Sequence, residues 1–502
     1  MSHEAHKGAL YNYLNLLLIT VAGVFLTPFV VRSLGTSQYG LYTLVGAMIP
    51  YLMLLDMGMS KTITRYVAHY RAHNEQESEA QFLTTTVGIY GIITLILLSV
   101  GIYLYLNCEH IWSSNFTPNE LYCVRQMILV ITIAHTIIIP GNAFTAVCNG
   151  CGLFAFPRIL QPIKYLIRCV CVVALLLWGG KAHALITLEM VLNIGMAVAT
   201  LLYVRHHIGR AHIFSKRSLD YRPILKYAGW IALYATTCAL QWNAGQIVAG
   251  MHFDTTAVGV MGVGILIGNM YGYFADTINR MTLPHASRLM KEDHSSDCIT
   301  QNMIRIGRII AVVQMGVLSA FAIFGQSFIQ LWVGPEYKMA YIIALIMMSA
   351  WIVQQTQDYG NALIEAKGRV RTMAIINFIS IFAGVIISYW VAPHYGTIGV
   401  IAALAGGTVL ATIASNIYYR HRLQLNTARY FVRVYGRLCI ATLLCAAPFY
   451  AIDYFTTDTP NWLWLALGIP AYITIYAAAI YWGVLSKEEK EELKRNVQHN
   501  RG

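Results

Sequence analysis

The sequence has little charge for its length. Only 12% of its 502 residues are Asp, Glu, Lys or Arg, whereas 57% are hydrophobic, and the mean hydropathy is +0.55. So few charged groups cannot cover the surface of a water-soluble domain, which excludes that class. The chain is therefore expected to be an integral membrane protein.

Signals typical of several other classes are missing. The N-terminus lacks the basic segment, short apolar core and small-residue cleavage site of a removable signal peptide, so the first span should remain as an anchor. No glycine-rich nucleotide loop follows a strand, which argues against ATP-driven transport by this chain alone. Cys148 and Cys151 form a CxxC without a second pair or a neighbouring His, so we expect structural thiols, no metal site and no cofactor.

Acidic residues are fewer than basic ones, 23 against 35. In a soluble protein this excess would suggest a nucleic-acid partner. Here the cations lie between apolar runs, where basic loops keep membrane spans oriented with those loops in the cytoplasm. We therefore expect no nucleic-acid partner.

Long apolar runs dominate the chain. Fourteen segments have the roughly 20 apolar residues needed to cross about 30 Å of hydrocarbon. In chain order these spans are centred in Ala9 to Val31, Tyr39 to Met59, Phe82 to Leu106, Glu120 to Val147, Ile159 to Trp178, Ala182 to Val204, Leu225 to Gly250, Ala257 to Ile278, Ile304 to Leu331, Tyr341 to Leu363, Val370 to Val391, Thr397 to Tyr419, Tyr430 to Phe455 and Trp462 to Leu485. The intervening loops alternate between basic and cation-poor, which predicts that both termini are cytoplasmic. The expected fold class is an all-α polytopic membrane protein with about 14 transmembrane helices.

The two halves of the chain contain an internal repeat. The segment from Thr36 to Gly46 aligns with that from Thr255 to Ile265, and the alignment pairs Gly40 with Gly259. Both segments cross the membrane in the same direction, which indicates a parallel repeat of six spans. The predicted boundaries are an N-terminal lobe at 1–215, a C-terminal lobe at 216–425, two additional helices at 426–486 and a cytoplasmic tail at 487–502.

Several short motifs surround the first copy of this repeat. A tight outer turn is expected at Ser33 to Ser37, and the second span is expected to give way to a basic amphipathic helix, Lys61 to Ala72, with Ser60 as its N-cap. The motifs are Arg32-Ser33-Leu34-Gly35, Tyr39-Gly40-Leu41-Tyr42, Leu55-Asp56-Met57-Gly58, Thr64-Arg65-Tyr66-Val67 and Val258-Gly259-Val260.

With these motifs the chain resembles the polytopic flippases for lipid-linked oligosaccharides. Their superfamily also includes multidrug and toxin extrusion antiporters and peptidoglycan lipid flippases. The resemblance implies two six-helix lobes around a cavity that opens alternately to each face of a bacterial plasma membrane. It also implies transport of undecaprenyl-diphosphate-linked glycans for O-antigen, capsule or exopolysaccharide assembly. The implied partners are the glycan lipid, membrane lipids, a coupling proton or sodium ion, and the glycan polymerase machinery.

Cations inside spans are the first candidates for binding a lipid diphosphate. Lys164 and Arg168 lie one turn apart on the fifth span, and Arg125 lies on the fourth. A guanidinium can bind two phosphate oxygens and stays charged at any relevant pH. The alternative is that these side chains extend toward the interface, and this alternative is stronger for Lys164 than for Arg168.

The tenth span is expected to carry the most polar helix face, with Gln354, Asp358, Asn361 and Glu365 spaced as on one side of a helix. The face could line a cavity that holds sugars or a coupling cation, or it could form a hydrogen-bonded seam between helices. The sequence leaves both possibilities open.

Further polar candidates lie in repeat-related positions. Asp276 and Arg280 on the eighth span are expected to pair, which favours a structural role. Asp56, the repeat counterpart of Asp276, either stabilises the start of the amphipathic helix or forms an inner gate with Asp276, Arg65 and Arg280; the first is favoured narrowly.

Two other sets remain. His135 lies deep in the fourth span, where it could titrate in a proton-coupled carrier, although a hydrogen bond to a neighbouring helix is the favoured interpretation. Amides on the first and seventh spans, Asn12, Asn15 and Gln241, could bind sugar hydroxyls or join helices.

Two other functions are possible on this sequence. A cation-coupled drug or metabolite antiporter of the same superfamily is the nearest alternative, and the cations in the fourth and fifth spans argue against it. A membrane enzyme such as a glycan polymerase normally carries its catalytic acids on a large loop. The longest segments between spans here are short and basic, so no enzyme is expected.

Overall fold

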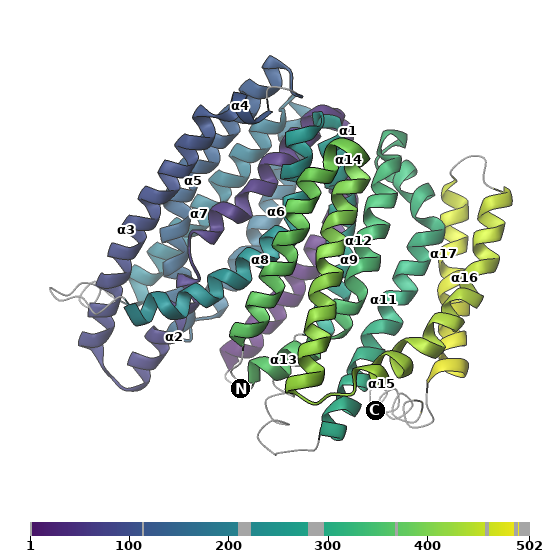
Figure 1. The fold of residues 1–502 in the computed structure, drawn as a ribbon. Coiled ribbons are helices and arrows are strands. Elements are labelled where there is room, and N and C mark those ends of the chain that lie inside the picture. Colours follow the sequence, from purple (N-terminus) through teal and green to yellow (C-terminus); the bar gives the residue numbers. More distant parts are fainter. Residues whose placement is uncertain are drawn as a thin grey trace. The chain divides into compact units, whose positions relative to one another are not determined.

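The structure is a computed structural model that describes residues 3–112, 115–208, 222–279, 296–366, 370–456, 461–485 and 490, with side chains described from residue 22 onward except at 208, 222–227, 277–278, 366, 370 and 454–456. Over this part of the chain every regular element is a helix (Figure 1). The predicted all-α fold class is confirmed. The helices are α1 (His3–Leu54), α2 (Met59–Ala72), α3 (Gln76–Leu106), α4 (Cys108–Trp112), α5 (Pro118–Gly150), α6 (Ala155–Leu177), α7 (Ala182–Ile208), α8 (Arg222–His252), α9 (Thr255–Asn279), α11 (Ser296–Trp332), η1 (Pro335–Tyr337), α12 (Lys338–Thr356), α13 (Asp358–Ala366), α14 (Val370–Arg422), α15 (Thr427–Phe431), η2 (Val432–Gly436), α16 (Arg437–Thr456), α17 (Trp462–Ala479) and η3 (Ile480–Val484).

Eleven helices in the described residues are long and apolar enough to cross a membrane. Two of them, α1 and α14, have 52 and 53 residues and bend sharply at Gly35 and Gly396, so each supplies two spans. Gly35 has φ 73°, a left-handed conformation that glycine adopts without a Cβ penalty. Because α1 and α14 each count twice, the eleven helices supply thirteen spans, and α8 supplies the fourteenth, in agreement with the fourteen predicted spans. The bend at Gly35 confirms the predicted turn.

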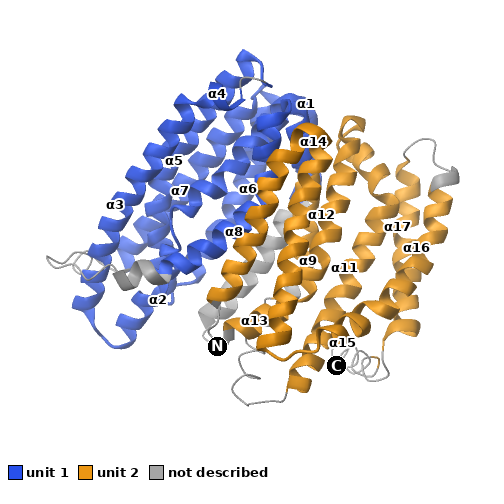
Figure 2. Ribbon diagram, in the orientation of Figure 1, with its two compact units in different colours: residues 1–262 blue, residues 263–502 orange. Residues whose placement is uncertain are grey.

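The chain forms two compact units, residues 1–262 and 263–502 (Figure 2). Their boundary lies inside α9, so the first two turns of α9 belong to unit 1. The predicted lobe boundary at 215/216 divides the two copies of the internal repeat, which is a different division from that into compact units. This boundary and the later ones at 425/426 and 486/487 stay predictions.

Unit 1 has a core in which α2 packs against α3 and α5. Met59, Ile63 and Val67 form the buried stripe of α2, as the predicted amphipathic helix requires. Cys148 is buried in the same core. Burial raises the pKa of the Cys151 thiol to about 11, so this thiol stays protonated, as expected for a structural cysteine.

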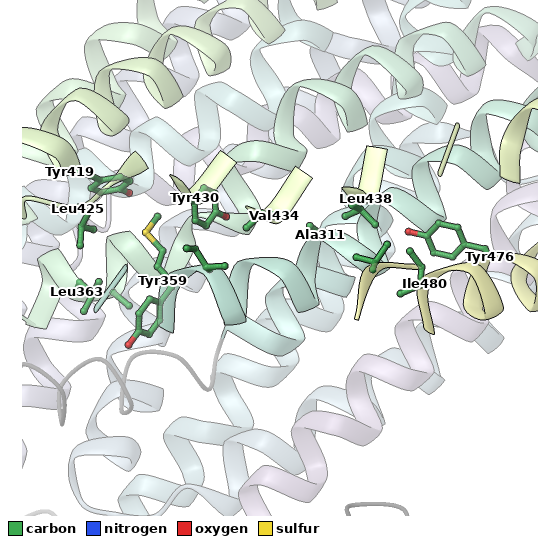
Figure 3. Packing of buried hydrophobic residues seen from close by; sticks show 14 of the residues in the cluster. Ala311, Tyr359, Leu363, Tyr419, Leu425, Tyr430, Val434, Leu438, Tyr476 and Ile480 are labelled. Carbon is green, nitrogen blue, oxygen red and sulfur yellow. The ribbon is translucent and has the colours of Figure 1, made fainter. Parts of the chain in front are cut away.

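Unit 2 has a core that attaches the last two long helices to α11 (Figure 3). Tyr476 of α17 donates a hydrogen bond to the carbonyl of Val312 at 2.8 Å, and Tyr472 lies 2.5 Å from the hydroxyl of Ser319. Buried tyrosines therefore supply both apolar area and a polar anchor at this contact. The two C-terminal helices are an integral part of unit 2.

Candidate functional site

The first feature of unit 1 is a close crossing of α1 and α9 at two glycines. A Cβ atom on Gly40 would overlap the carbonyl oxygen of Thr255, and one on Gly259 would lie 3.0 Å from the carbonyl oxygen of Thr36. Only glycine permits so close an approach of two backbones. The two residues that the repeat alignment pairs thus pack against each other at the predicted outer end of the spans.

The carboxylate of Glu120 holds this crossing together. One of its oxygens accepts hydrogen bonds from Ser37 Oγ at 2.5 Å and from Thr255 Oγ1 at 2.7 Å. The other accepts from the backbone nitrogen and the hydroxyl of Thr117, both at 2.8 Å. Thr117 and Glu120 form a capping box at the start of α5. One side chain therefore joins the N-terminal ends of α5 and α9 to α1.

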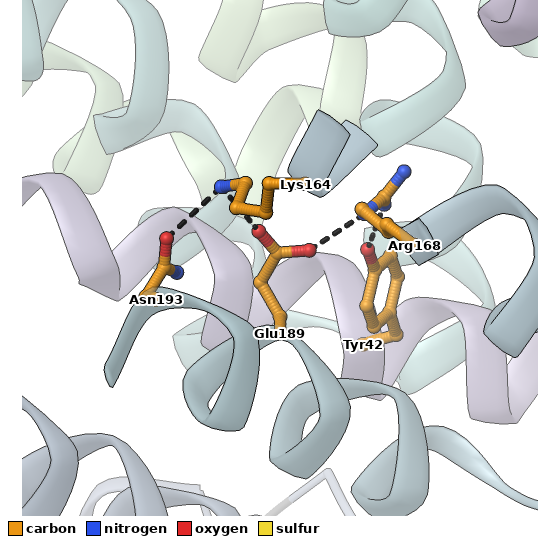
Figure 4. A network of polar contacts seen from close by, with 5 residues as sticks. All are labelled: Tyr42, Lys164, Arg168, Glu189 and Asn193. Carbon is orange, nitrogen blue, oxygen red and sulfur yellow. Dashed lines mark hydrogen bonds and ion pairs between the residues drawn. The ribbon is translucent and has the colours of Figure 1, made fainter. Parts of the chain in front are cut away.

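A second feature of unit 1 is a charged cluster between α6 and α7 (Figure 4). Glu189 accepts from Arg168 Nε at 2.6 Å and from Lys164 Nζ at 3.3 Å. Lys164 also donates to Asn193 Oδ1 at 2.9 Å, and Arg168 Nη2 lies 3.2 Å from Tyr42 Oη of α1. Two cations and one carboxylate leave the cluster with one net positive charge.

This cluster is partly shielded from solvent. The side chains of Lys164, Arg168 and Glu189 are 17%, 22% and 23% exposed. Limited access of water strengthens the attraction between opposite charges in such a position, although it also costs each charge part of its hydration. Arg168 and Lys164 thus point to the same carboxylate, and neither extends alone toward the interface.

Unit 1 also has a cavity of about 680 Å³ between α1, α2 and α8, bordered by Asp56, Lys61 and Asn243. Asp56 accepts hydrogen bonds from the backbone nitrogen of Ser60 at 3.2 Å and from Tyr90 Oη at 2.8 Å. The N-cap of α2 is Gly58, so the prediction of Ser60 was wrong. The Asp56 carboxylate caps α2 from two residues before Gly58, which agrees with its structural interpretation.

In unit 2 the polar face of the tenth span is divided by a helix break. α12 ends at Thr356 and α13 begins at Asp358, so the four residues are not one face of a continuous helix as predicted. At the break, the buried side-chain amide of Gln357 exchanges two hydrogen bonds with the side-chain amide of Asn416 on α14, at 3.0 and 2.8 Å.

The residues after the break form a half-buried hydrogen-bonded group. Asp358 accepts from Asn279 Nδ2 and from Asn361 Nδ2, each at 3.0 Å, and Asn361 Oδ1 accepts from Tyr419 Oη at 2.8 Å. A small polar cavity of about 10 Å³ adjoins them and is bordered by Gln354 and Asn361. Asp358 and Asn361 thus hydrogen-bond to α9 and α14, which fits a seam between helices, and a role of this face in holding sugars or a coupling cation stays a prediction.

Comparison with known proteins gives the family. The sequence pattern of the family described as "Polysaccharide biosynthesis protein" matches residues 5–290, more than half of the chain. The chain belongs to the polysaccharide biosynthesis protein family. The predicted resemblance is therefore confirmed, and the site features of unit 1 lie within the matched region.

The sequence is also similar to that of a named protein. A protein of Shigella flexneri that is provisionally named an O-antigen transporter is 16% identical over 401 residues, which cover 78% of this chain and 92% of that protein.

Solved structures show the same fold. The lipid II flippase MurJ in an inward closed conformation superposes with a TM-score of 0.72 at 13% identity, covering 94% of this chain and 97% of that one. An inward-facing multidrug resistance MATE family transporter of the MOP superfamily gives a TM-score of 0.64 at 14% identity, covering 80% of this chain and 98% of that one. At these identities the likeness shows the fold alone. Family and fold together identify the chain as a multi-span helical membrane protein of the polysaccharide biosynthesis protein family.

The remaining predicted residues lie apart from one another. Arg125 lies over the ring of Tyr105, 4.4 Å from its centroid, and 3.7 Å from Glu109. Its partners on α3 and α4 differ from those of Arg168. His135 is buried and donates from Nδ1 to the carbonyl of Ile131 in its own helix at 2.7 Å, which supports a structural role.

Other predicted residues are exposed or outside the described part of the chain. Arg65, Asp276 and Glu365 are exposed, and Gln241 is half-buried on α8. The side chains of Asn12 and Asn15 and the whole of Arg280 lie outside the described residues. The pairing of Asp276 with Arg280 and the inner gate stay predictions.

Sequence reasoning missed two acids that organise unit 1. Glu189 stands inside an apolar run, a costly position that itself indicates a partner. Glu120 follows Thr117 at the spacing of a capping box, immediately before an apolar run. Both signals are readable in the sequence.

Proposed function

We propose that this family member is an alternating-access flippase that moves an undecaprenyl-diphosphate-linked oligosaccharide from the inner to the outer leaflet of a bacterial plasma membrane. The observation that carries the proposal is the net positive cluster of Lys164, Arg168 and Glu189 inside apolar spans. A lipid diphosphate must carry its negative charge through the low-dielectric part of the membrane, and a partly shielded cation lowers that cost. The O-antigen transporter name of the Shigella relative and the lipid II flippase with the same fold support the substrate class.

The glycine crossing supplies a closing contact for this cycle. Gly40, Gly259 and the Glu120 carboxylate join α1 and α9 at the end that the loop charges assign to the outer face. In this account the contact closes the outer side while the glycan lipid enters from the cytoplasmic side, where both termini lie.

The proposed function is tested by deleting the gene in its native host, which should leave lipid-linked repeat units on the cytoplasmic leaflet and reduce surface glycan. Wild-type protein should restore export. Normal glycan export in the deletion strain, with no other flippase present, would contradict the proposal.

The fold likeness to a multidrug transporter supports a second candidate, a cation-coupled drug or metabolite antiporter. Such a carrier would raise resistance to organic cations when it is overproduced. Resistance together with unchanged glycan export would favour this alternative.

We place the coupling to protons or sodium at the Asp358 group in unit 2. Asp358→Asn removes the one carboxylate that receives hydrogen bonds from both Asn279 and Asn361. We expect export to fall at least about tenfold, the effect of losing one hydrogen-bonded charge, and to become insensitive to the ion gradient. Glu365→Gln is the control, because Glu365 lies on the same helix α13 but is exposed. Gradient-dependent export by Asp358→Asn would remove this residue from coupling.

A further inference from the structure

Unit 1 contains a second, larger cavity that the proposed transport path does not use. It is a groove of about 840 Å³ between α3, α5 and the C-terminal end of α2. Leu83, Val87 and Leu95 line it from α3, and Phe144 and Val147 line it from α5. Most of its wall is therefore apolar, unlike the surroundings of the charged cluster.

One end of this groove is polar and carries both signs of charge. Arg71, at the end of α2, lies with Nε 3.0 Å and 3.2 Å from the two carboxylate oxygens of Glu79 on α3. Glu75, in the turn between the two helices, borders the same end and is exposed. One guanidinium and two carboxylates therefore border this end of the groove, and the local charge is not simply basic.

The rest of the groove opens along the surface of α3. Val87 and Leu95 are 53% and 66% exposed, on a helix that is long and apolar enough to span the membrane. The polar end coincides with the start of that span, which is the depth of lipid head groups. From Glu79 to Leu95 the helix rises about 24 Å, enough for the groove to follow an extended acyl chain.

We propose that this groove binds a zwitterionic aminophospholipid of the bilayer. The lipid phosphate lies at Arg71, its ammonium group at Glu75 and Glu79, and one acyl chain along Leu83, Val87 and Phe144. Charge complementarity selects this head group: an anionic lipid would meet two carboxylates with only one cation, whereas a zwitterion places each of its charges opposite the other sign. The site is a lateral binding site for a bilayer lipid, and its existence does not depend on the transported substrate.

The apolar part of the site is tested by filling the groove. Gly91 lines it, and a Cβ on Gly91 would have no heavy atom within 4 Å, so Gly91→Leu adds bulk to the groove without a clash at that atom. Gly88→Leu is the matched control, because Gly88 lies on the same helix, has equal room and does not line the groove. Full-length protein is exposed to an equimolar mixture of phosphatidylethanolamine, phosphatidylglycerol and phosphatidylcholine and then partly delipidated. Mass spectrometry of the intact protein counts the retained lipid.

We expect wild-type protein and Gly88→Leu to retain phosphatidylethanolamine and Gly91→Leu to lose it, with all three proteins eluting as the same folded species. Equal retention by Gly91→Leu and Gly88→Leu would overturn the site.

The head-group assignment is tested by removing one carboxylate. Glu75→Gln should lower the preference for phosphatidylethanolamine over phosphatidylglycerol about tenfold, the effect of a lost charged hydrogen bond. Glu77→Gln removes the same charge from the same turn of chain but does not border the groove, and it should retain the wild-type preference. The assignment would be overturned if the wild-type protein preferred phosphatidylglycerol to phosphatidylethanolamine. It would also be overturned if Glu75→Gln and Glu77→Gln changed this lipid preference equally.

Discussion

Gly40→Ala is expected to stop glycan export almost completely while the protein still reaches the membrane. The new Cβ would overlap the carbonyl oxygen of Thr255, a backbone atom that cannot move aside without displacing α9. Overpacking of this kind typically costs about 1–3 kcal/mol. Because that cost falls only on the state in which α1 and α9 touch, it shifts the conformational equilibrium by about fivefold to 150-fold against closure of this end. The measurement is surface glycan in a complemented deletion strain, normalised to protein in the membrane.

Two further substitutions test whether the loss of export follows the size of the clash. Gly259→Ala places its Cβ 3.0 Å from the carbonyl oxygen of Thr36, a tighter contact than usual but not an overlap, so export should fall less than in Gly40→Ala. Gly46→Ala, on the same helix α1, meets no heavy atom within 4 Å and should export normally. Equal activity in Gly40→Ala and Gly46→Ala would show that the crossing does not have to close during transport.

Arg168→Gln is expected to reduce export at least about tenfold, because it removes a charged donor worth about 1.5–3 kcal/mol and takes the cluster from one net positive charge to none. Glu189→Gln has the opposite effect on charge: it leaves both cations, so attraction of the diphosphate should persist although the two ion pairs between α6 and α7 are lost. Export should therefore fall less in Glu189→Gln than in Arg168→Gln. Initial export rates and the melting temperature are measured for both proteins.

The double variant separates charge from packing. Arg168→Gln with Glu189→Gln has no link between these two side chains but regains one net positive charge from Lys164, so it should export better than Arg168→Gln alone. Arg158→Gln, on the same helix and beside Phe154, is the control for loss of a cation outside the cluster. If export follows the melting temperature across the series, the cluster acts only in packing α6 against α7.

Much of the backbone of this chain could be predicted from its sequence. Apolar runs have a length set by the bilayer, and Gly35 and Gly58 mark the places where α1 bends and α2 begins. The repeat alignment paired Gly40 with Gly259, and those two residues meet in unit 1. Such features depend on local spacing and composition, which the sequence contains directly.

The partners of the polar side chains were harder to predict, because they depend on which helices become neighbours. Arg168 has no acidic residue near it in the sequence, yet Glu189 on the next helix lies 2.6 Å from it. No proline or glycine marks the break at Gln357, and the side-chain amide of Gln357 pairs with Asn416 of α14, far away in the sequence. A stripe drawn on an ideal helix could not anticipate either contact.

The most direct test of the central claim uses purified protein in liposomes that contain an undecaprenyl-diphosphate-linked oligosaccharide. A membrane-impermeant glycosidase reports how fast the glycan lipid changes leaflet under a proton or sodium gradient. We predict that the glycan lipid changes leaflet rapidly with wild-type protein and only slowly with Arg168→Gln. Empty liposomes give the background rate. Wild-type protein that moves the glycan lipid no faster than empty liposomes, while it exchanges an organic cation across the same membrane, would contradict the account.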